Sequence, residues 1–183
     1  MRWDRLFEDL EGQLRDEELA QRDADVVDRI RAERSRIGLG DRLRRHRGPI
    51  HLVLARGRLI VGDLLDAGAG WVLVQDGARG RALVPTDGIV EIEGLGWAGS
   101  DRQGVCASLG LGHPLRAFAR DRAVVEIEDV IGRSLVGTID AVGADAFEVA
   151  LHPREEPRRP ANVSRRPTIP FGAIVCVTAL RPA

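Results

Sequence analysis

The chain has 183 residues, of which 44% are hydrophobic and 30% charged, and its formal net charge is −1. No run of about 18 apolar residues occurs, which excludes a membrane-spanning helix, and the first residues lack the order of a secretory signal. We therefore expect a cytoplasmic protein with no membrane partner. The two cysteines, Cys106 and Cys176, lie in unlike contexts and are interpreted as buried thiols, with a disulfide as the alternative.

The N-terminal residues 3 to about 36 are predicted to form one long helix. Apolar residues recur there at spacings of 4, 3 and 4, which is the seam of an amphipathic helix: Trp3, Phe7, Leu10 and Leu14. Such a helix would be about 50 Å long, which is more than the expected diameter of the rest of the protein. We expect it to bend near residues 16–18, to pack on its own chain, or to pair through this seam with a second copy or a partner protein.

The remaining chain contains one pattern twice, and a repeat of this kind must be recognised before the fold is assigned. Three blocks return at offsets of 72, 75 and 85 residues: Gly38-Leu39-Gly40 as Gly110-Leu111-Gly112, Gly57-Arg58 with Gly62 as Gly132-Arg133 with Gly137, and Val84-Pro85 as Ile169-Pro170. The predicted domains are a helical extension (1–37), a first barrel (38–95), a Gly-rich connector (96–109) and a second barrel (110–183) with an Arg/Pro-rich loop (152–167).

Each copy is predicted to hold a short helix followed by five short strands. The expected strands cover 50–54, 58–66, 71–76, 81–85 and 89–93 in the first copy, and 125–127, 133–141, 146–151, 167–170 and 173–179 in the second. Gly62 and Gly137 fall inside strands, where an isolated glycine typically marks a bulge or a bend. Loop 152–167 contains four prolines and five arginines, a composition that forms no core and need not form a fixed structure.

These motifs resemble the Sm-like small barrel. Gly57-Arg58-x-Ile60-x-Gly62-x-Leu64 is similar to the first Sm motif, as is its counterpart around Gly132-Arg133, and Ile169-Pro170-Phe171 with Ile174 is similar to the C-terminal barrel of RimP-type ribosome maturation factors. The resemblance, which covers roughly residues 38–95 and 110–180, implies two tandem five-stranded Sm-like barrels, each with a short helix before it. With the long N-terminal helix predicted above, the expected fold class is α+β. The resemblance also implies RNA or the ribosome as a partner.

One departure from the Sm pattern limits what the resemblance implies about the ligand. RNA-binding Sm proteins place an Asp and an Asn after the bend, whereas this chain has Ala69 and Val72 in the first copy and Ala144 and Phe147 in the second. We therefore expect no uridine pocket of the Sm type, and fold resemblance alone does not carry function.

Arginines are concentrated in two stretches, which are the candidate nucleic-acid contacts. Residues 31–58 contain nine arginines and only two acidic residues, and the chain has no lysine. Clustered arginines bind phosphates by direct pairing and counterion release. The alternatives are a solvated helix face or a contact for the acidic N-terminal helix. The predicted residues are Arg42, Arg44, Arg45, Arg47, Arg56 and Arg58 in the first stretch, and Arg158, Arg159, Arg165 and Arg166 in the loop.

No pattern indicates an enzyme, a cofactor or a metal site. The histidines lack cysteine or carboxylate partners at ligand spacing, and no glycine run has the order of a phosphate-binding loop or a dinucleotide fingerprint. The sequence thus predicts a non-catalytic protein that binds RNA or a ribosome-associated partner through arginine patches. The alternative is a protein-interaction adaptor or homodimer that uses the N-terminal helix and the barrel edges.

Overall fold

The computed structural model describes residues 21–22, 25–77, 79–97, 108–156 and 158–181. The chain divides into two compact units, Met1–Gly38 and Leu39–Ala183. In the first unit, residues 21–22 and 25–36 are helical. Its apolar side chains are exposed, Val26 by 53%, Val27 by 45% and Ile30 by 42%.

The helix that the structure describes is shorter than the predicted one, and the rest of the predicted span lies outside the described residues. Within this helix, Arg31 donates to Asp28 at 3.2 Å and the Ser35 hydroxyl donates to the Ala32 carbonyl at 2.8 Å. The predicted seam of Trp3, Phe7, Leu10 and Leu14 lies outside the described residues.

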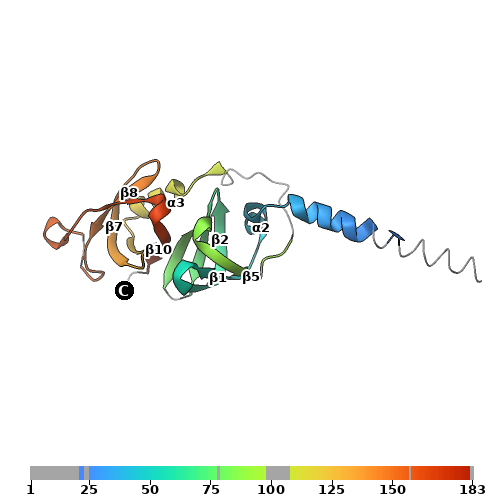
Figure 1. Ribbon diagram of the computed structural model, residues 1–183. Coiled ribbons are helices and arrows are strands. Elements are labelled where there is room, and N and C mark those ends of the chain that lie inside the picture. The colour runs from blue at the N-terminus through green and yellow to red at the C-terminus, as the bar shows by residue number, and fades with distance from the viewer. Residues whose placement is uncertain (1–20, 23–24, 78, 98–107, 157, 182–183) are drawn as a thin grey trace, which may run out of the picture. The chain divides into compact units, whose positions relative to one another are not determined.

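The second unit holds ten strands close to the predicted positions (Figure 1). A short helix precedes each set of five: α2 (Leu39–Arg45) before the first strand set and α3 (Gly112–Arg120) before the second. The first strand set is β1 (Pro49–Leu54), β2 (Leu59–Gly68), β3 (Trp71–Asp76), β4 (Gly80–Pro85) and β5 (Ile89–Glu93). The second strand set is β6 (Val124–Asp129), β7 (Ser134–Val142), β8 (Ala146–Leu151), β9 (Thr168–Pro170) and β10 (Ile174–Leu180).

The prediction of two closed barrels is wrong, because all ten strands form one open antiparallel sheet. The strand order is β5-β1-β2-β3-β4-β10-β6-β7-β8-β9. The outer edge of β4, which would have to close the first barrel, is instead occupied by β10 of the second strand set. Because this pairing supplies hydrogen bonds to both strands, neither set needs to close upon itself.

The two strand sets have the same register, strand by strand. Ile50 pairs with Gly62 in the first set, and Val125 pairs with Gly137 in the second. The second strand of each set also bulges at the same place, between Leu64 and Asp66 in β2 and between residues 139 and 141 in β7. The sequence repeat is therefore a structural repeat with equivalent residues on equivalent strands.

The glycine in each second strand is required by a close approach of the neighbouring strand. A Cβ atom on Gly62 would collide with the backbone carbonyl of Gln75, and one on Gly137 would collide with that of Ala150. Backbone oxygens in a paired strand cannot move aside, so only glycine fits. These glycines correspond to the predicted bend positions.

Two apolar clusters form the core, and each includes residues from both strand sets. Trp71 and Leu83 of the first set belong to the cluster that is mostly built from the second set. In return, Val175 and Cys176 of β10 pack in the cluster of the first set. Because each core is incomplete without the other set, the second unit is expected to unfold as one body.

Candidate functional site

The predicted arginine patch around α2 is largely engaged in contacts within the chain. The Arg42 side chain donates to the backbone carbonyls of Gly96 and Leu95, each at 2.9 Å, and stacks 4.1 Å from the ring of Trp97. Its guanidinium therefore fixes the segment that follows β5 to the first strand set.

The other arginines of this patch stabilise α2 itself. Arg44 pairs with Asp41 at 2.5 Å, and Arg47 donates to the carbonyls of Arg44 and His46 at 2.9 and 2.8 Å. These carbonyls belong to the C-terminal end of the helix, where arginine side chains satisfy acceptors that have no helical partner. Arg45 also interacts within the chain. The sequence predicted these residues as one nucleic-acid contact, and the structure gives them intramolecular partners.

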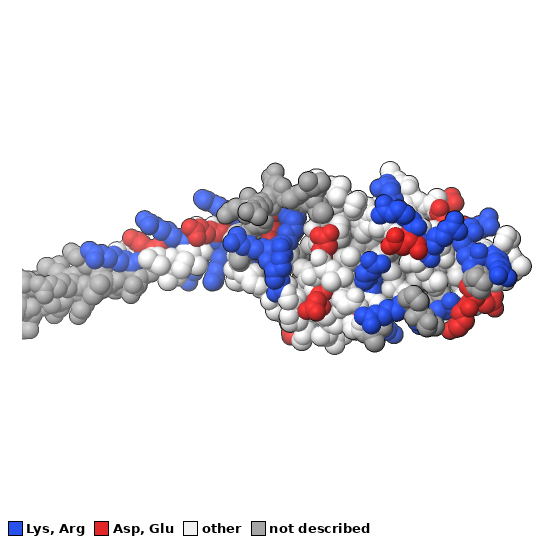
Figure 2. Space-filling model, turned by 180° about the vertical axis from the view of Figure 1, so that it is seen from behind, with Lys and Arg blue, Asp and Glu red and all other residues white. Residues whose placement is uncertain are grey.

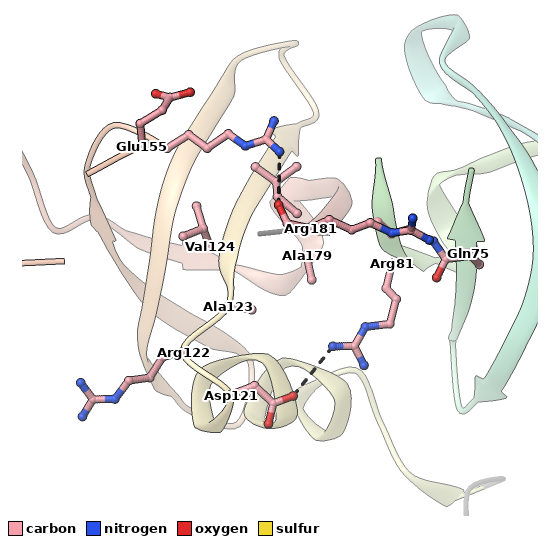
Figure 3. A pocket seen from close by; sticks show the side chains of 12 residues that line it. Gln75, Arg81, Asp121, Arg122, Ala123, Val124, Glu155, Ala179 and Arg181 are labelled. Carbon is pink, nitrogen blue, oxygen red and sulfur yellow. Dashed lines mark hydrogen bonds and ion pairs between the residues drawn. The ribbon is translucent and has the colours of Figure 1, made fainter. Parts of the chain in front are cut away.

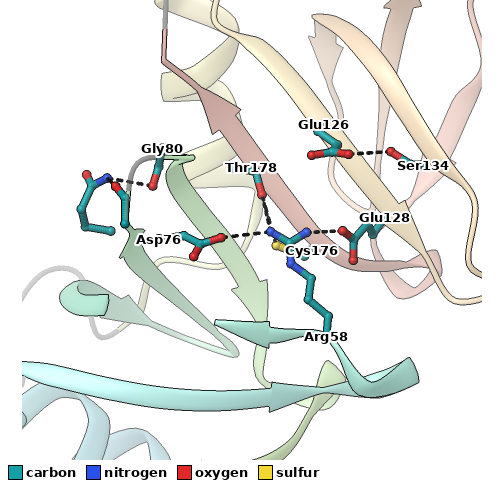
Figure 4. Close-up of polar contacts among 10 residues, drawn as sticks. Arg58, Asp76, Gly80, Glu126, Glu128, Ser134, Cys176 and Thr178 are labelled. Carbon is teal, nitrogen blue, oxygen red and sulfur yellow. Dashed lines mark hydrogen bonds and ion pairs between the residues drawn. The ribbon is translucent and has the colours of Figure 1, made fainter. Parts of the chain in front are cut away.

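Arg58 lies where the two strand sets join, and its side chain is only 10% exposed (Figure 4). It forms an ion pair with Glu128 of β6, pairs with Asp76 of β3 at 3.2 Å, and donates to the Thr178 hydroxyl of β10 at 3.1 Å. Its Nε atom is buried without a hydrogen-bond partner. Burial by itself lowers the pKa of Arg58, but the adjacent negative groups outweigh it and raise the pKa.

A second arginine packs across the same boundary from the β1–β2 turn. Arg56 has a left-handed backbone (φ 71°, ψ 13°), and its guanidinium lies against the backbone of Gly132 in the β6–β7 turn. A Cβ atom at Gly132 would meet this guanidinium. We call the pairing of β4 with β10, together with Arg56 and Arg58, the repeat junction.

The four predicted arginines of loop 152–167 are all exposed, and one of them forms an ion pair. Arg158 donates to both oxygens of Asp140, each at 2.6 Å, which fastens the loop to β7. The loop has further order, because Ser164 and the carbonyl of Arg165 hydrogen-bond to Leu151 at the end of β8. Arg159, Arg165 and Arg166 are exposed.

A different group of arginines, which the sequence did not indicate, surrounds a hollow of about 500 Å³ beside the repeat junction (Figure 3). The residues come from four separate segments: Arg81 at the start of β4, Arg122 after α3, Arg154 at the start of the loop, and Arg181 after β10. We call this site the arginine hollow. The sequence did not indicate this site, because strand pairing assembles it from distant segments: β10 pairs with β6 on one side and with β4 on the other, and the β4 pairing adds Arg81 to the three arginines of the second strand set.

The sheet ends in two strand edges that have no partner strand within the described part of the chain. The β5 edge is the free side of β5, and the β9 edge is the free side of β9. In the repeat, β5 is equivalent to β10 and β9 is equivalent to β4. The two free edges are thus the counterparts of the two strands that pair with each other at the repeat junction.

Other classes of site receive no support from the described residues. Among these residues, no three His, Cys, Asp or Glu side chains gather closely enough to hold a metal ion. Within the same part of the chain, no helix has the length and apolar character needed to cross a membrane. The equivalents of the Sm base-binding positions include Val72 and Phe147, and both are buried in the core.

Comparison with known proteins gives no significant match, whether to a family model, to a curated protein or to a solved structure.

Proposed function

We propose that this protein is an assembly module whose copies join head to tail, the β9 edge of one copy pairing with the β5 edge of the next. One observation supports the proposal above all. The chain already contains this joint once, between β4 and β10, and it leaves the equivalent pair of strands open. An open strand edge is a template for pairing with a further strand.

The register of the repeat junction specifies the register of the proposed joint. Leu83 pairs with Val177 at the junction. Their equivalents in the repeat are Thr168 in β9 and Ile92 in β5. Thr168 of one copy should therefore lie opposite Ile92 of the next, with Arg166 opposite the position after β5.

The backbone of the β9 edge has hydrogen-bonding groups available for this joint. The carbonyls of Pro167 and Arg165 accept hydrogen bonds from β8, at 3.1 Å from Val149 N and 2.9 Å from Leu151 N. Successive residues of an antiparallel strand direct their N–H and C=O groups to alternate sides. The groups of Arg166 and Thr168 consequently point away from β8, toward the open edge. The missing N–H of Pro167 lies on the β8 side and does not interrupt the outer row.

The most exposed large apolar side chains of the second unit lie on the two halves of the proposed joint. Val90 is 71% exposed and Leu59 60% exposed beside the β5 edge, while Ile131 is 64% and Val130 50% exposed beside the β9 edge. Ile131 is the repeat equivalent of Arg56, which packs against the β6–β7 turn at the repeat junction. The joint would bring Ile131 against the β1–β2 turn of the next copy.

The repeat equivalent of Val90 indicates that such a joint would bury the Val90 side chain. Val175 of β10 occupies the same place in the second strand set, and it is only 2% exposed because the repeat junction covers it. At about 25 cal/mol per Å² of apolar surface, burying four such side chains supplies a substantial part of an association free energy.

The charges of the two edges are also complementary. The β9 edge carries the exposed Arg165 and Arg166, and the adjacent Arg133 is 61% exposed, whereas Glu91 and Glu93 of β5 are exposed. Arg133 is equivalent to Arg58, and Glu93 is equivalent to the Thr178 that Arg58 contacts. The joint would replace the Arg58–Thr178 hydrogen bond by an ion pair.

A head-to-tail joint uses two different surfaces, so it produces a closed ring or an open filament, depending on the rotation between copies. The proposed function is therefore that of a scaffold, and we place it in the cytoplasm. The buried Cys176 is a free thiol, which is compatible with a reducing compartment.

The test is the mass of the full chain in solution, measured by sedimentation velocity over a range of concentrations. We expect the natural chain to form species larger than a dimer and Ile131→Asp to be monomeric. Leu65→Asp is the matched control, because Leu65 is 49% exposed on β2 and has no place in the joint. A natural chain that stays monomeric at high concentration, or equal effects of the two substitutions, would exclude the proposal.

A mixing experiment tests the head-to-tail geometry itself. Val90→Asp blocks the β5 edge and Ile131→Asp blocks the β9 edge, so each variant alone should be monomeric. An equimolar mixture retains one intact joint and should form a dimer of the two variants and nothing larger. If like edges paired with like edges, each variant alone would still form a dimer.

A further inference from the structure

We infer that the arginine hollow binds the sugar–phosphate backbone of single-stranded RNA. This inference concerns a site inside one chain and does not rest on the proposed assembly. It also differs from the sequence prediction, because the arginines predicted around α2 are held by close contacts within the chain. In the hollow the contacts are longer: Arg81 lies 3.8 Å from Asp121 and 5.6 Å from the centre of the Phe118 ring, and Arg154 donates to the Arg181 carbonyl at 3.3 Å.

The repeat junction builds the hollow. Arg81 pairs in register with Ala179, and Gly80 pairs with Leu180. This pairing brings the start of β4 beside Arg181, which follows the end of β10. In Figure 3, Arg81 and Arg181 lie on one side of the hollow and Arg122 lies on the other.

The arginines of the hollow are poorly neutralised. Four arginines face two carboxylates, those of Asp121 and Glu155. The ion pair between Arg81 and Asp121 is long, at 3.8 Å, and both of its side chains are about half exposed. Within the described part of the chain, Arg154 donates only to the Arg181 carbonyl, at 3.3 Å. The guanidinium groups thus keep donors that can bind phosphate oxygens in pairs.

The two carboxylates favour an RNA backbone over a compact anion. A small, highly charged phosphate in the hollow would be repelled by Asp121 and Glu155. Along an RNA strand, by contrast, each phosphodiester carries one negative charge and is separated from the next by a ribose. Its 2′-hydroxyl can donate a hydrogen bond to a carboxylate, and this hydroxyl is what distinguishes RNA from DNA.

The backbone fixes the position of Arg122 at the rim. Arg122 follows the C-terminal end of α3 with a left-handed φ of 51°, and the Ala123 N–H donates to the Phe118 carbonyl at 3.1 Å, which is a usual way for a helix to end. No aromatic ring is among the described residues that line the hollow, so contact with the RNA backbone rather than base stacking is expected.

The experiment measures fluorescence anisotropy of a labelled 12-nucleotide oligouridylate with the full chain at 50 mM and 200 mM salt. The test variant is Arg122→Gln with Arg181→Gln, which removes two exposed guanidinium groups. The matched control is Arg29→Gln with Arg36→Gln, which changes the net charge equally on the exposed helix of the first unit. We expect the hollow variant to lose at least tenfold in affinity and the control less than twofold.

Three further measurements make the outcome specific. Each phosphate contact contributes about 0.7 to the log–log salt slope on a single strand, so the hollow variant should have a slope that is lower by about 1.4. Asp121→Asn should reduce the preference for RNA over a DNA strand of the same sequence. Because the hollow lies within one chain, Ile131→Asp should bind RNA as a monomer, which separates this inference from the assembly.

Several outcomes would overturn the inference. One is a natural chain that fails to bind RNA at 50 mM salt. Another is an equal loss of affinity in the hollow variant and the control variant. Binding of duplex DNA with equal affinity, or complete displacement of the RNA by 5 mM inorganic phosphate, would also exclude an RNA backbone as the ligand.

Discussion

Replacing Arg58 by methionine tests whether the two strand sets depend on their shared ion-pair network. The substitution keeps most of the aliphatic stem but removes the charge that Asp76 and Glu128 share and the donor to Thr178. The side chain of Asp76 is 14% exposed and that of Glu128 is 27% exposed, so the substitution would leave both carboxylates largely buried without a counter-charge.

The expected loss follows from that burial. Breaking a buried ion pair by removing one partner costs about 3–5 kcal/mol. Water can reach Glu128 in part, which places the expected loss near the lower limit, about 3 kcal/mol. Such a loss is a large fraction of the 5–15 kcal/mol that is usual for a folded domain.

The assay is urea unfolding of the full chain followed by circular dichroism, with the free energy of unfolding obtained by linear extrapolation. Arg120→Met is the matched control, because Arg120 is exposed at the end of α3 and lies outside the repeat junction. We expect this control to cost less than 1 kcal/mol. A triple variant with leucine at positions 58, 76 and 128 should regain much of the loss, since an apolar replacement leaves no uncompensated charge.

Equal losses for Arg58→Met and Arg120→Met would refute the reasoning. So would two separate unfolding transitions in the natural chain, because these would show that the strand sets fold independently of the network.

Three further predictions concern single residues. Hydrogen bonds from the backbone and side chain of Arg133 outweigh the effect of burial and lower the pKa of Asp129. Asp129 therefore stabilises the fold above its unfolded pKa of about 3.9, and this contribution is lost as the pH falls through the lower folded value. Asp129→Asn should flatten the loss of thermal stability below about pH 4, and an unchanged pH profile would contradict this. Burial raises the pKa of the Cys176 thiol to about 11, so in a Cys106→Ser variant a thiol reagent at pH 8 should react only after unfolding in urea; rapid reaction of the folded protein would exclude a buried thiol. Gly137→Ala should destabilise the protein by more than about 2 kcal/mol in urea unfolding, because the new methyl group meets a backbone carbonyl; an exposed Gly96→Ala, with open space around it, is the control.

Local features of the fold were accessible from the sequence. The sequence placed ten strands and two short helices near their observed bounds. The signals were the alternation of apolar residues, the positions of Gly62 and Gly137, and the repeat offsets of 75 and 85 residues. These signals are short in range, because they depend on the pleat, the turns and the space available to one residue. The closed barrels were wrong for a different reason: closure depends on which strand occupies the outer edge of β4, and no local pattern encodes that choice.

The candidate sites also include residues that the sequence indicated and residues that only the structure brings together. Charge clustering along the chain led to the arginines around α2, yet Arg42 and Arg58 are used for packing and for the repeat junction. The arginine hollow assembles Arg81, Arg122 and Arg181 from distant segments, and clustering along the sequence could not indicate it. The composition of loop 152–167 left open whether the loop is ordered, and in the structure Arg158 and Ser164 fasten it to the sheet.

The sequence by itself determined that this protein is a repeat of a five-stranded unit, because each copy carries its own glycines, turns and apolar alternation. The tertiary structure alone decided how the units combine. Different strand edges offer similar backbone hydrogen-bonding groups, so these groups alone do not select a partner strand. Side-chain packing selects β10 as the partner of β4, because it buries Val175 and Cys176 in the apolar cluster of the first strand set. The same pairing creates the repeat junction, the arginine hollow and the two free edges from which both proposals arise.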